Sequence, residues 1–223
     1  MRAMRRLKPD RVPRELLEQI VDAAIRAPTG GNTQTYHYVV VDDPATIARL
    51  APLWRRAVEL YLTPQQGHPP PTTSPEQLAR VLAAARFAAD HFEQIPALIV
   101  ACLDTASVRR YSLATLAPMA QGFVRLGLPH SATAARNFPR FMQRSTAACI
   151  LPGVENALIA ARSLGLGACL TTWHLLFEQD FKRVLGIPRA VSTWAVIPVG
   201  YPRGRFGPVS RRPLSQSLHW NAW

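Results

Sequence analysis

Hydrophobic and polar positions along the chain predict helices that separate short strands. From residue 15 to 27 the apolar side chains recur at helical spacing, which predicts a helix over Glu15–Ala27. Further helices, bounded by proline or glycine, are expected over 44–62, 75–93, 150–164 and 177–185. Runs of β-branched and aromatic residues predict strands over 36–42, 98–103, 168–171 and 193–199. Strands divided by helices indicate a mixed α/β or α+β sheet covered by helices.

Three stretches depart from this pattern. Residues 63–74 are rich in proline and polar side chains, which predicts a loop. Residues 105–147 are expected to form helical pieces broken at Pro118, Pro129 and Pro139. Residues 201–223 have no periodicity and predict an extended arm. We find no internal repeat, so the 223 residues are expected to form one domain, 1–223.

The formal net charge is +12, and arginine supplies almost all of the cations because only Lys8 and Lys182 are lysines. Residues 105–147 contain six arginines and no acidic residue. Two interpretations stay open for this basic segment. It binds an anionic partner, such as a nicotinamide dinucleotide, a phosphate cofactor or nucleic acid, or it is a solvated helix face.

Composition excludes several classes of protein. The longest apolar run, Leu98–Leu103, is too short to span a membrane, and the basic N-terminus lacks the apolar stretch of a signal peptide. We therefore expect a cytoplasmic protein that does not insert into membranes. The three cysteines have no metal or redox spacing, which predicts inert core thiols, no disulfide and no metal site.

Candidate chemistry lies in two short segments. The loop after the first helix carries Thr29, Asn32 and Gln34 beside two glycines, a set that suits contact with a flat heterocycle. Three arginines within residues 2–6 suit a phosphate monoester, although a basic terminal tail would look the same. The chain shows no phosphate-binding loop and no activated nucleophile, so a cofactor is expected to supply the chemistry.

The loop Ala27-Pro28-Thr29-Gly30-Gly31-Asn32-Thr33-Gln34 resembles the Ala-Pro-Ser-Xaa-Xaa-Asn-Xaa-Gln motif of the FMN-dependent nitroreductases. Four further segments resemble that family in the right order, at residues 1–10, 155–167, 186–202 and 211–214. The resemblance therefore covers most of the chain. It implies an α+β, three-layer α-β-α sandwich with a mostly antiparallel sheet. It also implies a homodimer whose C-terminal arm, 201–223, crosses onto the partner subunit.

The resemblance also implies which residues bind FMN. Arg2, Ala3, Met4 and Arg5 would hold the cofactor, with Arg2 at the phosphate and Arg5 at the pyrimidine edge. Arg211, or its neighbour Arg212, would be a second phosphate ligand. The neighbouring subunit's flavin would be contacted by Pro28, Thr29, Gly30, Asn32 and Gln34. The backbone amides of Leu170, Thr171 and Thr172 would face the flavin ring.

The chain departs from the family pattern at a few positions. Met1 stands where the family usually has a further arginine, and Thr35-Tyr36-His37 replaces Pro-Trp-Arg. His37 is expected to be a surface strand residue, and His174 stands near the position of a common glutamate and is interpreted as structural. Trp173 is expected either in the core or as a wall of the substrate slot.

The function that the resemblance implies is hydride transfer from NAD(P)H through FMN to nitroaromatics, quinones or similar planar acceptors by a ping-pong mechanism. No side chain need act as acid or base, and residues 105–147 would form a helical lid. One alternative is a specialised flavin enzyme of the same fold that oxidises a ring, removes a halogen or cleaves flavin. Another is a non-catalytic basic protein that binds nucleic acid, which we favour less because charge speaks to association and not to fold.

Overall fold

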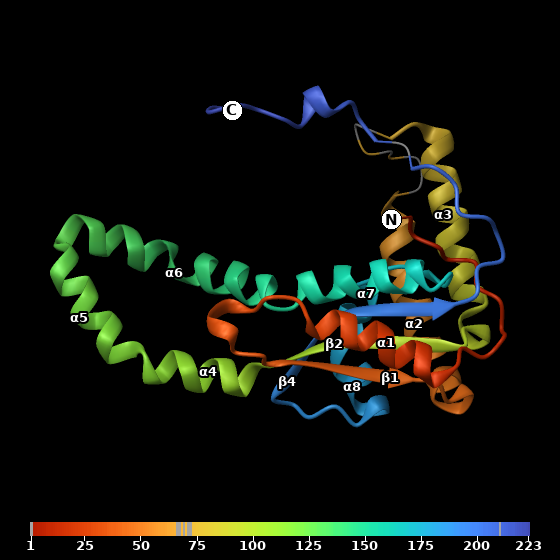
Figure 1. Ribbon diagram of the computed structural model, residues 1–223, viewed down its shortest axis with the longest axis horizontal. Helices are drawn as coiled ribbons and strands as arrows, with labels where there is room; N and C mark the ends of the chain where they lie inside the picture. The colour runs from red at the N-terminus through yellow and green to blue at the C-terminus, as the bar shows by residue number, and fades with distance from the viewer. Residues whose placement is uncertain (1, 66–67, 69, 71–72, 210) are drawn as a thin grey trace.

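A single antiparallel sheet lies in the middle of the molecule (Figure 1). The computed structural model describes every residue except 1, 66–67, 69, 71–72 and 210. Within the described residues the sheet has four strands in the order β1 (Tyr36–Val41), β2 (Ala97–Asp104), β4 (Val191–Gly200) and β3 (Gly167–Ala168). Each neighbouring pair is antiparallel.

Helices cover both faces of the sheet. On one face α1 (Arg14–Ile25) and α7 (Leu151–Ser163) pack against Ile99 and Leu103 of β2. On the other face α2 (Pro44–Leu62), α3 (Pro75–Asp90) and α8 (Glu178–Leu185) pack around Leu98 and Val100. Since both faces of β2 are covered, its apolar run is continuous instead of alternating. The expected three-layer α-β-α sandwich is confirmed.

Helix ends follow local capping chemistry. The Asp43 carboxylate accepts hydrogen bonds from the first turn of α2, and Ser74 and Gln77 form a capping box at the start of α3. The helix expected over 75–93 instead ends at Asp90, and a short 3-10 helix, Phe92–Gln94, follows. In the expected loop 63–74, Thr63–Gln65 forms a 3-10 turn, and residues 66–67, 69 and 71–72 lie outside the described part of the chain.

Residues 105–147 are more continuously helical than expected. They form α4 (Thr105–Ala114), α5 (Leu116–Leu126) and α6 (Leu128–Ala148). Pro118 and Pro129 lie in first turns, where the missing N–H removes no helical hydrogen bond. Pro139 lies inside α6 without ending it, so the expected break there is wrong. The break before α6 falls at Gly127, whose φ of 75° suits glycine.

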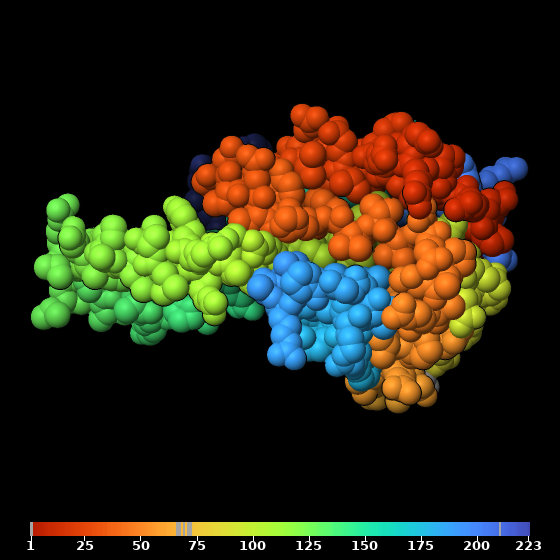
Figure 2. Space-filling model, turned by 90° about the horizontal axis from the view of Figure 1, so that it is seen from below, coloured from red at the N-terminus to blue at the C-terminus, as the bar shows by residue number. Residues whose placement is uncertain are grey.

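Two parts of the chain extend away from the sandwich. Helices α4, α5 and α6 project beyond the sheet, and none of their residues is buried (Figures 1 and 2). After Gly200 the chain first pairs with the N-terminal segment, through the Leu7–Pro202 bridge, and then leaves the body (Figure 1). Its described residues beyond Pro202 contain one 3-10 turn, Leu214–Gln216. Trp220 and Trp223 in this segment are exposed.

The strand expected over 168–171 is shorter than predicted. Only Gly167–Ala168 forms β3, and Thr171 then makes an isolated bridge with Val196 of β4. The chain between them turns outward, which leaves Leu170 exposed.

Candidate functional site

The basic N-terminal segment is attached to the β3–β4 edge of the sheet. The Met4 N–H donates to the carbonyl of Ala168 at 3.0 Å, and Leu7 forms a bridge with Pro202. Gly167 permits this approach, because a Cβ there would lie 2.9 Å from the Leu7 side chain. The segment is therefore bound to the body of the protein, and the alternative of a detached basic tail is wrong.

The three N-terminal arginines point to different surroundings. The Arg6 guanidinium lies 5.0 Å from the centre of the Phe87 ring. Arg2 lies against Gly207, where an added Cβ would be 3.1 Å from its Nη1 atom. Arg5 turns inward, and its Nε atom is buried without a hydrogen-bond partner among the described residues. Arg5 is thus the arginine whose side chain enters the protein.

Thr171 lies beside Arg5, and both line one small cavity. The Thr171 N–H donates to the Val196 carbonyl at 3.0 Å, and its carbonyl accepts from the Val196 N–H at 2.9 Å. The expectation that the Thr171 amide faces a flavin ring is therefore wrong, since the sheet uses that amide. The Thr171 hydroxyl is buried and unpartnered among the described residues. Leu170 and Thr172 are exposed, and no hydrogen bond occupies their amides within the described part of the chain.

The loop Thr29–Gln34 is held by its own side chains. The Gln34 N–H donates to Thr29 Oγ1 at 3.2 Å, and Gln34 Nε2 donates to Asn32 Oδ1 at 3.1 Å. Gly31, Asn32 and Gln34 have φ values of 60°, 51° and 47°. Left-handed backbone is uncommon for glutamine, and such strain often marks a functional loop. Pro28 and residues 30–34 are exposed, which leaves this loop open to a ligand or a second chain.

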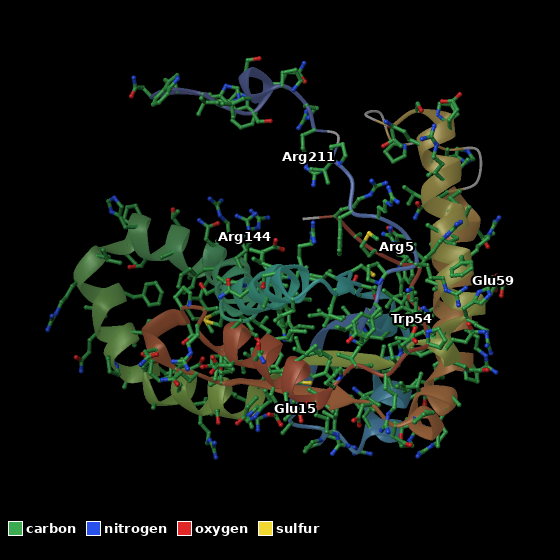
Figure 3. All side chains as sticks on the ribbon, turned by 45° about the vertical axis from the view of Figure 1, so that its right-hand side comes forward. Arg5, Glu15, Trp54, Glu59, Arg144 and Arg211 are labelled. Atoms are coloured by element: carbon green, nitrogen blue, oxygen red, sulfur yellow. The ribbon has the colours of Figure 1, made fainter. Side chains whose placement is uncertain are left out.

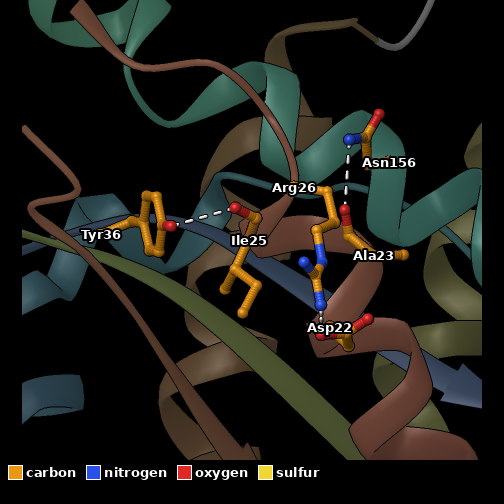
Figure 4. Close-up of polar contacts among 6 residues, drawn as sticks. All are labelled: Asp22, Ala23, Ile25, Arg26, Tyr36 and Asn156. Atoms are coloured by element: carbon orange, nitrogen blue, oxygen red, sulfur yellow. Dashed lines mark hydrogen bonds and ion pairs between the residues drawn. The ribbon is translucent and has the colours of Figure 1, made fainter. Parts of the chain in front are cut away.

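Side chains from two other elements fix the helix end from which this loop departs (Figure 4). The Tyr36 hydroxyl donates to the Ile25 carbonyl at 3.0 Å, and Asn156 Nδ2 donates to the Ala23 carbonyl at 3.2 Å. Arg26 and Asp22 form an ion pair at 2.8 Å on the exposed side of the same turn. The last carbonyls of α1 are thereby satisfied, and the loop leaves the helix in a defined direction.

The loop and Arg5 lie toward opposite ends of the sheet. Tyr36, which follows the loop, is opposite Leu103, and Leu103 is opposite Ser192 on β4. Ala168, which bonds the N-terminal segment, is opposite Val199 on the same strand. Seven residues of strand correspond to roughly 23 Å. Within one chain, this separation is too large for a three-ring heterocycle to contact both.

A cavity of about 520 Å³ separates the loop from the projecting helices. Gly30 and Thr33 lie on one wall, and side chains of α4, α5 and α6 line most of the rest. The α6 side chains Phe138, Phe141, Met142 and Ser145 follow helical spacing, a signal that could have identified this wall from the sequence. Among the described lining residues there is no acid, and Arg109 carries the single cationic side chain.

The histidines agree with the structural interpretation. His37 is exposed on β1, so the expectation of a surface strand residue is confirmed. His174 is buried against the Phe181 ring, and burial lowers the pKa of its imidazole to about 4. Trp173 is half-buried, packs 5.7 Å from the Trp54 ring and also lines the Arg5 cavity, so it contributes both to packing and to the site.

The three cysteines are at least partly buried, and none belongs to a cluster of metal-ligating side chains among the described residues. Burial raises the pKa of the Cys102 thiol to about 12 and that of Cys169 to about 11, so both stay protonated and inert. Cys149 is half-buried, and its Sγ accepts a hydrogen bond from the Gly30 N–H at 3.4 Å. The described cysteines are free, and no cluster of metal-ligating side chains occurs among the described residues.

Arg211 lies on the C-terminal segment as it leaves the body, whereas Arg5 lies within the body of the protein (Figure 3). The assignment of Arg211 rather than Arg212 to a phosphate stays a prediction. The contacts of Ala3 with a cofactor also stay a prediction. In the part of the chain that the structure describes, no helix combines the length and apolarity needed to cross a membrane.

These features define a class of protein: a helix-covered antiparallel sheet with a cationic N-terminal segment at one end and a strained polar loop at the other. The Nitroreductase family model matches residues 2–201. The chain belongs to the Nitroreductase family, as the sequence motifs predicted.

Individual relatives agree with this assignment. A protein of Thermus thermophilus called NADH dehydrogenase is 27% identical over 224 residues, which cover 98% of this chain and 91% of that protein. A putative NADH dehydrogenase/NAD(P)H nitroreductase of Methanothermobacter thermautotrophicus is 24% identical, covering 90% of this chain and 73% of the relative.

A solved structure of iodotyrosine deiodinase bound to FMN and 3-iodo-L-tyrosine has the same fold. The match covers 100% of this chain and 96% of the deiodinase chain, with a TM-score of 0.65 and 17% sequence identity. At this level of identity the likeness establishes the fold alone.

Proposed function

We propose that the protein is an FMN-dependent oxidoreductase that passes a hydride from NAD(P)H to nitroaromatics, quinones or similar planar acceptors. The observation that carries this proposal is the inward-turned Arg5, whose Nε is buried and unpartnered and whose side chain lines one cavity with Thr171 at the β3–β4 edge. The names of the relatives support an oxidoreductase that uses a nicotinamide dinucleotide. A cytoplasmic location, where NAD(P)H is available, is part of this proposal.

The residues at this edge fit a flavin. FMN would supply the capacity to accept a hydride and donate it again. Arg5 would place a positive charge at the pyrimidine edge, and Arg2 with Arg211 would bind the phosphate by paired hydrogen bonds. The amides of Leu170 and Thr172, two exposed residues, would orient the ring, and these residues with Ala3 and Met4 complete the proposed contact set.

We propose that the active protein is a homodimer with two shared sites. The separation of the Thr29–Gln34 loop from Arg5 supports this arrangement, because a second copy can bring its loop to the first copy's flavin. The exposed Trp220 and Trp223 and the unburied helices α4, α5 and α6 give each chain apolar surface that a partner would cover. Pro28, Thr29, Gly30, Asn32 and Gln34 would then contact the partner's cofactor.

The cavity beneath α4 and α6 supports a role for residues 105–147 as a lid over the acceptor. Its walls combine Phe138, Phe141 and Met142 with serine and threonine hydroxyls, a lining that suits an aromatic molecule. A specialised reaction of the same fold, such as dehalogenation, is the second candidate. It would use the same site, and the lid would set the substrate.

The absorption spectrum of the purified protein tests the proposal. After incubation with FMN and removal of excess cofactor, we expect a yellow protein that releases one FMN per chain on denaturation. NAD(P)H added without oxygen should bleach the flavin absorption, and a quinone added next should restore it. A protein that does not bind FMN in titration would contradict the proposed function.

A further inference from the structure

A small, partly enclosed cavity lies beside the Arg5 side chain. Its volume is about 10 Å³, and apart from Arg5, Thr171 and the indole rings of Trp54 and Trp173 its lining is apolar or thiol. A cavity must offer about 10–15 Å³ by this measure to hold one water molecule. The space therefore fits a single water and nothing larger.

Three of its lining residues each carry a buried polar atom that has no hydrogen-bond partner among the described residues. These atoms are Arg5 Nε, Trp54 Nε1 and Thr171 Oγ1. Trp54 is 1% exposed and Thr171 is 8% exposed, so bulk solvent does not satisfy them. The indole and guanidinium N–H groups can only donate, whereas the hydroxyl can donate or accept. Two donors cannot satisfy each other, so an acceptor must lie between them.

We propose that one ordered water molecule occupies this cavity. Its oxygen accepts hydrogen bonds from Trp54 Nε1–H and Arg5 Nε–H, and one of its hydrogens is donated to Thr171 Oγ1. Three hydrogen bonds are typical of a buried water. This arrangement satisfies all three orphaned atoms at once, whereas none of the three makes a direct hydrogen bond to another.

Trp54 gives the water a fixed partner. Its ring stacks on Phe92 with centres 4.7 Å apart and meets the Trp173 ring edge-on at 5.7 Å. The indole N–H therefore has a defined direction. Figure 3 shows Trp54 and Arg5 at the same end of the molecule, away from Arg144 on the projecting helices.

This inference rests on the proposed function for its consequence. A water bound to Nε fixes the plane of the Arg5 guanidinium and leaves the two terminal nitrogens for the flavin edge. Trp54 and Thr171 are then positioning residues for Arg5, acting through the same water. Because they share one water, removing either group should remove the effect of the other.

The test uses full-length protein loaded with FMN, as the parent and as Trp54→Phe, Thr171→Val and the double variant. Trp194→Phe is the matched control, since its indole donates to Ser192 at 2.9 Å, outside this cavity. Crystal structures that resolve ordered waters should show the cavity water in the parent and in Trp194→Phe. The water should be absent in Trp54→Phe and in Thr171→Val.

FMN titration gives the second measurement. Each single variant should raise the FMN Kd about two- to tenfold, the loss expected for one hydrogen bond. The double variant should bind no more weakly than the weaker single variant, and Trp194→Phe should bind like the parent. If Trp54→Phe does not fold, Thr171→Val carries the test, because valine matches threonine in shape.

An empty cavity in the parent would overturn the proposal, as would additive losses in the double variant or unchanged FMN binding in both single variants. A parent that binds no FMN would overturn the proposed function instead. In that case a crystal structure of the flavin-free parent still tests whether a water molecule occupies the cavity.

Discussion

Replacing His174 should remove a pH dependence from the stability of the protein. The imidazole is 1% exposed, lies 5.4 Å from the centre of the Phe181 ring, and has no hydrogen-bond partner for either nitrogen among the described residues. Burial lowers its pKa from 6.5 to about 4, although the nearby Glu178 carboxylate opposes this shift. The folded protein therefore contains a neutral His174 over a range in which the unfolded chain binds a proton.

The sign and size follow from proton linkage. Between pH 6.5 and about 4 the unfolded state binds more protons at this position, so the free energy of unfolding falls as the pH is lowered through that window. The contribution is fully present above pH 6.5. With about 1.36 kcal/mol per pKa unit, the loss is roughly 2 kcal/mol at pH 5 and about 3 kcal/mol in the limit below pH 4.

Urea unfolding followed by circular dichroism at pH 7.5 and pH 5 measures this difference. His174→Leu replaces the imidazole by an apolar side chain of similar size that does not titrate. The free energy of unfolding should then fall less between pH 7.5 and pH 5 than in the parent, by roughly 2 kcal/mol. An unchanged pH dependence in His174→Leu would refute the reasoning.

Three further changes test the remaining assignments. In FMN titrations, Arg5→Ala and Arg211→Ala should each weaken FMN binding about ten- to a hundredfold. The control His37→Ala should bind FMN like the parent. Parent-like binding in both arginine variants would contradict the two assignments. Deleting residues 205–223 should give a protein that sediments as a monomer or an aggregate and binds little FMN. A full-length protein that sediments as a monomer and holds stoichiometric FMN would exclude shared sites. Gly153→Ala should lower the free energy of unfolding, measured in urea, by about 1–3 kcal/mol, because its Cβ would lie 2.8 Å from a backbone carbonyl of α1. An unchanged free energy of unfolding would contradict that packing.

Much of the fold could be predicted because local sequence and final packing agree. Residues 44–62 form the expected helix, which begins at a proline after an aspartate cap, and residues 98–103 lie within a strand buried on both faces. Pro139 predicts a helix break because a proline inside a helix removes one hydrogen bond, but the 21-residue α6 sustains that cost. The other backbone hydrogen bonds of this long helix outweigh the one that Pro139 removes.

The candidate site could be predicted only in part. Arginines within residues 2–6 indicated an anionic ligand, but their spacing did not show that Arg5 alone turns inward. That direction depends on Leu7, whose burial beside Gly167 orients the segment. The Thr171 amide was assigned to a flavin because the motif carries no information about the bridge to Val196. Trp54 was missed because a tryptophan within an apolar helix face is indistinguishable from core until its N–H is found unpaired.

The position of the Thr29–Gln34 loop explains why its role is the hardest to read from one chain. Its side chains hydrogen-bond one another, so a local interpretation, in which they only close the loop, accounts for these side-chain contacts. That interpretation leaves unexplained the left-handed backbone at Gln34 and the exposure of residues 30–34 beside a cavity of about 520 Å³. Both features have a cause if a second chain approaches, because the loop is then held in advance in the shape that meets the partner's flavin. The strain and the separation from Arg5 therefore favour the same conclusion, that each site is completed by two copies of this chain.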